Sequence, residues 1–126
     1  QDGEIAFREL EIEVTKEVAG QRNAVITCGG GIVLNKINID RLREGGEIVY
    51  LTASPGTILK RVANKKGQSP LLEVDDPALT IRNLLKFRKP FYERVADVTI
   101  NTSKLDIDAV AEQIIAKLKE DESFNF

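Results

Sequence analysis

The sequence predicts an α/β domain in which helices cover both faces of a parallel sheet. Three short apolar segments, 24–27, 47–53 and 97–102, have the length and composition of buried strands. The longer segments around them carry apolar residues every three or four positions, as on one face of a helix. Strands that alternate with helices and are largely apolar are typical of parallel sheets buried between helical layers.

A helix is predicted before the first apolar segment. Phe7, Leu10, Val14 and Val18 recur at helical spacing and form one apolar stripe, with charged residues between them. Gly20 is placed to end this helix, since glycine readily adopts the backbone conformation of a helix C-terminus.

Two later helices begin with a capping residue followed by proline. Such pairs stand at 54–55 and 76–77, and they predict helices over 55–64 and 77–95, the second interrupted by Pro90. Residues between these helices, about 65–75, are predicted to form a loop.

Two further helices have candidate caps without proline. Asn38 is predicted to cap a short helix that ends at Gly45 and Gly46, and Asp106 is predicted to cap the last helix. The last helix has an apolar stripe that we expect to face the core: Ile107, Val110, Ala111, Ile114, Ile115 and Leu118.

The composition of the 126 residues excludes several kinds of chemistry. There is no histidine and a single cysteine, so a histidine base, a histidine-based triad and an intrachain disulfide are excluded. The formal net charge of −2 does not favour nucleic acid as a partner, and no apolar run is long enough for a membrane span. We therefore expect a protein of a soluble, reducing compartment such as the cytoplasm, and separately we expect a monomer. The chain begins with Gln1 rather than methionine, so we expect its natural start to lie upstream.

A glycine triplet, Gly29, Gly30 and Gly31, follows the first predicted strand. Glycines at the carboxyl end of a parallel strand let a ligand approach the backbone closely. A turn that merely requires positive φ would explain the triplet equally well. The nucleotide-binding pattern GxxxxGK[ST] does not occur in these 126 residues.

Arginines on three predicted helices are candidates for binding an anion. Arg8, Arg61 and Arg88 could each hold a carboxylate or phosphate through two parallel hydrogen bonds, although most arginines are solvated surface cations. Glu11 lies three residues after Arg8, so the two side chains share a helix face and can pair.

Two lysines and the cysteine are weaker candidates. Lys65 and Lys66 precede Gly67 in the predicted loop and could face phosphate groups, or simply be solvated. Cys28 is expected to be a small buried residue, because no histidine is present to activate its thiol.

The order of several motifs resembles the shikimate kinase family over nearly the whole chain. The segments that carry the resemblance are Gly3–Glu11, Val25–Val33, Glu47–Ala53, Pro70–Leu72 and Arg88–Thr102. Each segment alone is a weak signal, and their order and spacing together are specific. The resemblance implies a three-layer P-loop kinase-like fold in one domain over residues 1–126, with a lid at about 65–75.

The resemblance also assigns roles to the candidate residues. It implies that Arg8 and Arg88 bind the carboxylate of shikimate, that Glu11 orients Arg8, and that the glycine triplet lines the shikimate pocket. Arg61 matches a basic residue near the adenine of ATP.

The implied reaction is transfer of the ATP γ-phosphate, with Mg²⁺, to the 3-hydroxyl of shikimate. The family's first βα unit, with its P-loop and metal-holding acids, has no counterpart in this sequence, so we expect no metal ligand here and no activity from this chain alone. Ser69 also stands where the family's lid has an arginine, and Lys65 or Lys66 is a possible substitute.

Two alternatives remain open at the level of sequence. The chain could belong to a non-catalytic relative that binds shikimate or has a regulatory role. It could also belong to a P-loop-fold kinase that acts on another small metabolite.

Overall fold

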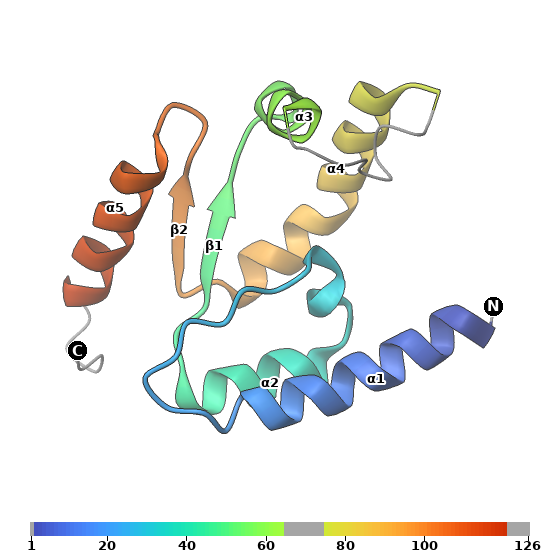
Figure 1. Cartoon of the computed structure of the whole chain (residues 1–126), viewed down its shortest axis with the longest axis vertical. Helices are drawn as coiled ribbons and strands as arrows, with labels where there is room; N and C mark the ends of the chain where they lie inside the picture. The colour runs from blue at the N-terminus through green and yellow to red at the C-terminus, as the bar shows by residue number, and fades with distance from the viewer. Residues whose placement is uncertain (1, 65–74, 121–126) are drawn as a thin grey trace. The chain divides into compact units, whose positions relative to one another are not determined.

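The computed structural model describes residues 2–64 and 75–120, which form five α-helices, one 3₁₀ helix and two strands (Figure 1). In chain order these are α1 (Asp2–Val18), η1 (Gly30–Leu34), α2 (Lys36–Gly45), β1 (Val49–Thr52), α3 (Pro55–Ala63), α4 (Pro77–Val95), β2 (Val98–Asn101) and α5 (Ile107–Glu120). The chain divides into two compact units, Gln1–Ile48 and Val49–Phe126.

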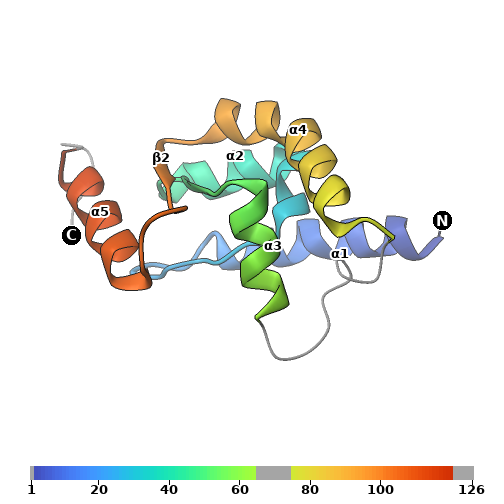
Figure 2. The same cartoon turned by 90° about the horizontal axis from the view of Figure 1, so that it is seen from above.

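The second unit contains the sheet. Its strands β1 and β2 run parallel, with Val49 opposite Val98 and Thr52 opposite Asn101 (Figure 1). Helices α3 and α4 connect the two strands and pack against each other (Figure 2), and α5 packs against β2. This parallel pairing with helical connections confirms the predicted α/β class.

The core of the second unit is built from residues of helix α4 and of strand β2, together with the residue that follows β2. Ile81 of α4 and Ile100 of β2 are buried, as is Thr102 directly after β2. Tyr50 of β1 also stacks against Tyr92 of α4, with 4.9 Å between the ring centroids. These contacts tie the long helix to the sheet.

The first unit is a helical pair with a short turn. Helix α1 packs against α2, and η1 packs against α2. The buried residues of this unit are two apolar side chains, Val33 and Ile39, and two polar ones, Thr15 and Asn38. The hydroxyl of Thr15 donates a hydrogen bond of 2.7 Å to the carbonyl of Glu11 within α1, which satisfies its buried donor.

The helix starts predicted from local signals are confirmed at three places. The side chains of Ser54, Asp76 and Asp106 each accept a hydrogen bond from the backbone N–H three residues later, at 3.2, 3.1 and 2.8 Å. Pro90 lies inside α4, as expected. These caps satisfy backbone donors that a helix start leaves unpaired.

The predicted strand at 24–27 is wrong. These residues adopt no regular structure, and Val25 is 95 % exposed. A parallel strand requires a neighbour to pair with its backbone groups, and within the part of the chain that the structure describes the sheet consists of β1 and β2 alone. The local composition of 24–27 indicates a strand, but a strand forms only where a neighbouring strand is present to hydrogen-bond to its backbone.

The predicted cap at Asn38 is also wrong. Helix α2 begins at Lys36 after Asn35, and the Asn35 side chain makes no capping hydrogen bond. Asn38 lies in the first turn of α2 and is 0 % exposed, and its side-chain amide donates to the carbonyl of Ile32 instead. A contact with the preceding 3₁₀ helix therefore uses the polar group that was expected to cap α2.

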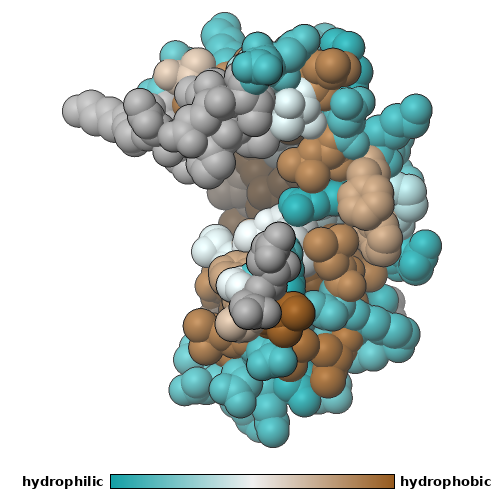
Figure 3. All heavy atoms as spheres, turned by 90° about the vertical axis from the view of Figure 1, so that its right-hand side faces the viewer, coloured by the Kyte–Doolittle hydropathy of each residue, from teal (hydrophilic) through white to brown (hydrophobic). Residues whose placement is uncertain are grey.

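The apolar stripe of the last helix is more exposed than predicted, and the stripe of the first helix is largely exposed as well. Phe7, Leu10 and Val14 of α1 are exposed, and Ile107 of α5 is 87 % exposed. Figure 3 shows hydrophobic side chains reaching the surface beside hydrophilic ones on the face that it presents. Helical periodicity identifies which face is apolar, whereas packing determines whether that face is covered.

No helix among residues 2–64 and 75–120 combines the length and the apolar character needed to cross a bilayer.

Candidate functional site

Arg8 is held in a fixed orientation on α1 by two carboxylates. Its Nε lies 3.2 Å from Oε1 of Glu4, one turn before it, and its Nη1 lies 3.0 Å from Oε1 of Glu11, one turn after it. The hydrogen bond with Glu11 is the main cause that raises the pKa of the Arg8 guanidinium, so it stays charged. The arrangement leaves other N–H groups of the same guanidinium available for an anion.

The glycine triplet approaches this arginine. Nη1 of Arg8 donates a long hydrogen bond of 3.5 Å to the carbonyl of Gly31. A Cβ atom at Gly31 would lie 2.7 Å from Nη1 and 3.0 Å from Nη2, too close for the arginine to remain in place. At Gly29 a Cβ would meet nothing within 4 Å. Gly30 begins η1.

This geometry distinguishes the two explanations of the triplet. Gly29 has φ of −70°, and φ at Gly31 also lies outside the left-handed range that favours glycine. Close approach of a side chain, rather than a left-handed backbone, is therefore what requires glycine at position 31.

Arg88 lies in α4 in the second unit. Its Nε is buried and has no hydrogen-bond partner within the described chain. A buried N–H of a cation without an acceptor is costly, so such atoms are rare in folded proteins. An anionic ligand would supply the acceptor, which makes Arg88 a strong candidate for a binding residue.

Arg61 lies on α3 and reaches the carboxyl ends of the two strands. Its Nη1 donates to Oγ1 of Thr102 at 2.9 Å, and its Nη2 donates to the Thr102 carbonyl at 2.7 Å. Oγ1 of Thr102 in turn donates to the carbonyl of Thr52 at 2.8 Å. Ligands of parallel α/β proteins bind at this end of the sheet, and Arg61 is itself exposed there.

Sequence reasoning missed Thr102 and Ser103 in this region. Thr102 bridges β1, β2 and Arg61, and Oγ of Ser103 accepts a hydrogen bond of 2.9 Å from the backbone N–H of Ser54. Hydroxyl residues directly after an apolar strand were the available signal, since the carboxyl ends of neighbouring parallel strands meet at one edge.

For the two loop lysines and the cysteine, the structure gives no support for a role in the site. Lys65 and Lys66 lie outside the described residues. Cys28 is exposed, which corrects the expectation that it is buried. Partial desolvation of its thiol, followed by the charge of Glu11, raises the pKa of Cys28, so a reactive thiolate is disfavoured.

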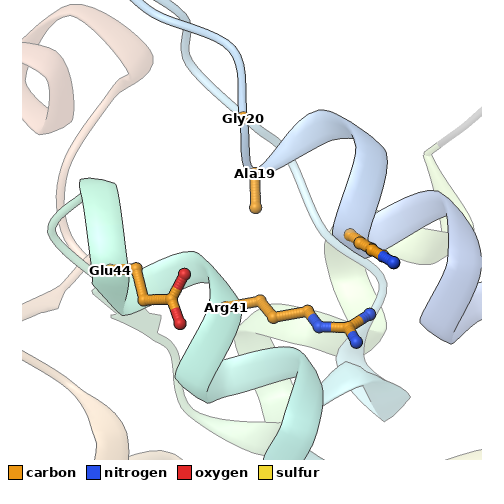
Figure 4. Close-up of a pocket in the computed structure, with 5 residues that line it drawn as sticks. Ala19, Gly20, Arg41 and Glu44 are labelled. Carbon is orange, nitrogen blue, oxygen red and sulfur yellow. The ribbon is translucent and has the colours of Figure 1, made fainter.

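A separate hollow of about 230 Å³ lies between the C-terminal parts of α1 and α2 (Figure 4). Lys16, Ala19 and Gly20 line it from one side, and Arg41 and Glu44 line it from α2. Lys16 lies in the last turn of α1, where a cation interacts favourably with the helix dipole, so its presence there does not require a ligand. None of the predicted site residues lines this hollow.

The described residues do not contain a metal centre of the usual kind. Over residues 2–64 and 75–120 there is no group of three or more acidic, cysteine or histidine side chains that could hold a metal ion.

The comparisons with known proteins agree on one family. The family model described as shikimate kinase matches residues 1–119. Among curated proteins, the shikimate kinase of Thermoanaerobacter pseudethanolicus is 47 % identical over 113 residues, which cover 90 % of this chain and 65 % of the relative. The shikimate kinase of Pelotomaculum thermopropionicum is 42 % identical over 120 residues, covering 95 % of this chain and 69 % of that protein.

Solved structures show the same likeness in three dimensions. Shikimate kinase from Acinetobacter baumannii in complex with shikimate matches with a TM-score of 0.85 at 32 % identity, over 97 % of this chain and 68 % of that one. Shikimate kinase from Bacteroides thetaiotaomicron matches with a TM-score of 0.80 at 31 % identity, over 94 % of this chain and 70 % of that one.

The chain thus spans about two thirds of its relatives' length, and 65 % in the case of T. pseudethanolicus. The structural likeness confirms the predicted P-loop kinase-like fold class. Because the family model extends over nearly all of the sequence and relatives above 40 % identity agree with it, the chain belongs to the shikimate kinase family.

Proposed function

We propose that the protein carrying this chain transfers the γ-phosphate of ATP to the 3-hydroxyl of shikimate, a step in aromatic amino-acid biosynthesis. Family membership over residues 1–119 supports the reaction. The observation that carries the proposal is the pairing of Arg8 with Gly31. It is a charged, oriented guanidinium that lies directly against the backbone of Gly31.

The proposed substrate site recognises a carboxylate. Arg8 and Arg88 bind the carboxylate of shikimate, Glu11 orients Arg8, and the glycine triplet allows the ring to approach the backbone. The fixed Arg8 and the unpartnered Nε of Arg88 support these roles. The solved A. baumannii enzyme is described as a complex with shikimate. Such a clamp holds the reacting hydroxyl in position, which is the main contribution a kinase of this kind makes.

The proposed nucleotide side involves Arg61, near the adenine of ATP. Its position at the carboxyl ends of β1 and β2 supports this role. Mg²⁺-bound ATP supplies the phosphoryl group, and the residues described here provide neither a phosphate-binding motif nor a metal cluster. Lys65 or Lys66 is proposed to supply the positive charge that the family's lid arginine provides.

We also propose that the protein is a cytoplasmic monomer whose partner is the small-molecule substrate, with no nucleic acid and no membrane involved. The net charge of −2 and the absence of a membrane-spanning helix among the described residues are compatible with this.

A coupled assay tests the proposed function directly. The protein is expressed with whatever coding sequence precedes Gln1, and ADP formation is followed with ATP, Mg²⁺ and either shikimate or a panel of sugar acids and nucleoside monophosphates. We expect turnover that depends on shikimate. Calorimetric binding of shikimate without turnover would favour the non-catalytic relative, and turnover of another metabolite would favour a kinase of different specificity.

Gly31→Ala tests the close approach of Arg8. The added Cβ displaces the guanidinium, and a misplacement of this kind lowers kcat/KM for shikimate roughly 10- to 100-fold. Stability changes little, because the clash is with the far end of a flexible side chain. Steady-state kinetics and thermal unfolding measure both effects.

Gly56→Ala is the matched control for this variant, since a Cβ at Gly56 meets nothing within 4 Å. Its kinetic constants should equal those of the wild type. Equal kcat/KM values for Gly31→Ala and Gly56→Ala would contradict the proposed role of the Arg8–Gly31 contact.

A further inference from the structure

Asn38 is a fully buried polar residue beside the candidate site. Its side chain is 0 % exposed and lies in the first turn of α2. Nδ2 donates a hydrogen bond of 3.4 Å to the carbonyl of Ile32 in η1. The carbonyl oxygen fixes which end of the amide faces it, because only the nitrogen can donate.

The other end of the same amide is unsatisfied. Oδ1 of Asn38 is buried and has no hydrogen-bond partner among the described residues. Burying an unpaired amide oxygen costs free energy, and a leucine of similar size would fill the space without that cost. Packing alone therefore does not account for asparagine at this position.

The hydrogen bond connects α2 to the segment that faces Arg8. Ile32 directly follows Gly31, whose carbonyl accepts from Arg8 and where an added Cβ would displace the Arg8 guanidinium. At the start of η1 the backbone N–H of Ile32 donates a hydrogen bond of 3.3 Å to the carbonyl of Gly29, the residue that precedes the helix. A 3₁₀ helix this short has few backbone hydrogen bonds of its own, so the hydrogen bond from Asn38 contributes much to fixing its position.

We propose that Asn38 is a positioning residue for the substrate site. By holding the Ile32 carbonyl against α2, it sets the spacing between Gly31 and the guanidinium of Arg8. This inference rests on the proposed function, because it assigns Asn38 an effect on the binding of the shikimate carboxylate. Asn38 itself touches neither substrate nor reacting atoms.

The kinetic test uses Asn38→Leu in the full-length protein. We expect the KM for shikimate to rise about five- to tenfold, which is the effect of losing one hydrogen bond, with kcat and the KM for ATP within about twofold of the wild type. Asn38→Ala, which adds no larger side chain, should likewise raise the KM for shikimate and leave kcat and the KM for ATP nearly unchanged. Ile39→Val is the matched control, because Ile39 is a buried neighbour on α2 that the proposal does not involve.

A double-mutant cycle with Arg8→Lys tests whether Asn38 acts through the arginine. If it does, Asn38→Leu changes the KM for shikimate much less in the Arg8→Lys background than in the wild type. Equal effects in both backgrounds, or uniform changes in all constants that Ile39→Val reproduces, would overturn the proposal.

Hydrogen exchange separates this proposal from the proposed function. Asn38→Leu should accelerate exchange of the backbone amides at 30–34 relative to Ile39→Val, whatever the substrate is. Unchanged exchange would refute the positioning role. A wild-type protein that does not act on shikimate would instead refute the proposed function, and the exchange result would still report on Asn38.

Discussion

Replacing Arg8 by lysine is expected to raise the KM for shikimate roughly 10- to 100-fold, because a bidentate, charge-assisted contact is replaced by a single point charge. The fixed geometry of the arginine is what the lysine loses. Two carboxylates hold the planar guanidinium of Arg8 in one orientation: Oε1 of Glu4 lies 3.2 Å from Nε, and Oε1 of Glu11 lies 3.0 Å from Nη1. Steady-state kinetics with shikimate as the varied substrate measure the change.

Arg22→Lys is the control for this substitution. Arg22 is exposed and lies outside the proposed site, so the same chemical change there should leave the KM for shikimate as in the wild type. A KM for Arg8→Lys within twofold of the wild type would show that Arg8 does not hold the carboxylate.

Arg88→Met is expected to weaken substrate binding without lowering the stability of the substrate-free protein. Without substrate, removing a buried and unpartnered N–H should leave the free energy of unfolding unchanged or raise it by about 1–3 kcal/mol. With substrate, loss of the guanidinium should raise the KM for shikimate at least roughly tenfold. Denaturant unfolding of the substrate-free protein and steady-state kinetics measure the two effects.

Arg82→Met is the control, because it makes the same replacement at an exposed position of the same helix. Arg82 is exposed on α4, so its replacement should change stability by no more than about 0.5 kcal/mol and leave the KM for shikimate unaltered. Marked destabilisation by Arg88→Met together with an unchanged KM would mean that Arg88 is a structural residue.

The parts of the fold that local signals specify were predictable from the sequence. Ser54, Asp76 and Asp106 cap helices because each side chain bonds to a backbone N–H three residues away, within a short stretch of sequence. The parallel orientation of β1 and β2 is non-local, but the alternation of strands and helices predicts it; the register of Val49 with Val98 could not be predicted in this way.

The parts that depend on distant partners were not predictable. Residues 24–27 have the composition of a strand, yet a strand forms only beside another one. Asn38 looked like a cap because its partner, the carbonyl of Ile32, lies in a different element. Thr102 likewise gains its role from Arg61, which is distant in sequence.

For the candidate site, the sequence identified which residues to consider, whereas only the structure shows what each of them contacts. Resemblance to the family identified Arg8, Glu11, Arg61, Arg88 and the glycine triplet, and their roles remain proposals. The sequence could not reveal that a Cβ at Gly31 would displace Arg8, nor that Nε of Arg88 is buried without a partner among the described residues. Both facts come from packing in three dimensions.

The most direct test of carboxylate recognition compares shikimate with its methyl ester as phosphate acceptor from ATP. Esterification removes the negative charge and keeps the 3-hydroxyl. The wild-type protein should prefer shikimate by roughly 10- to 100-fold in kcat/KM, and Arg8→Lys should lose most of that preference. Equal kcat/KM for the acid and the ester in the wild type would contradict the account, because no charged clamp on the carboxylate would then be contributing to catalysis.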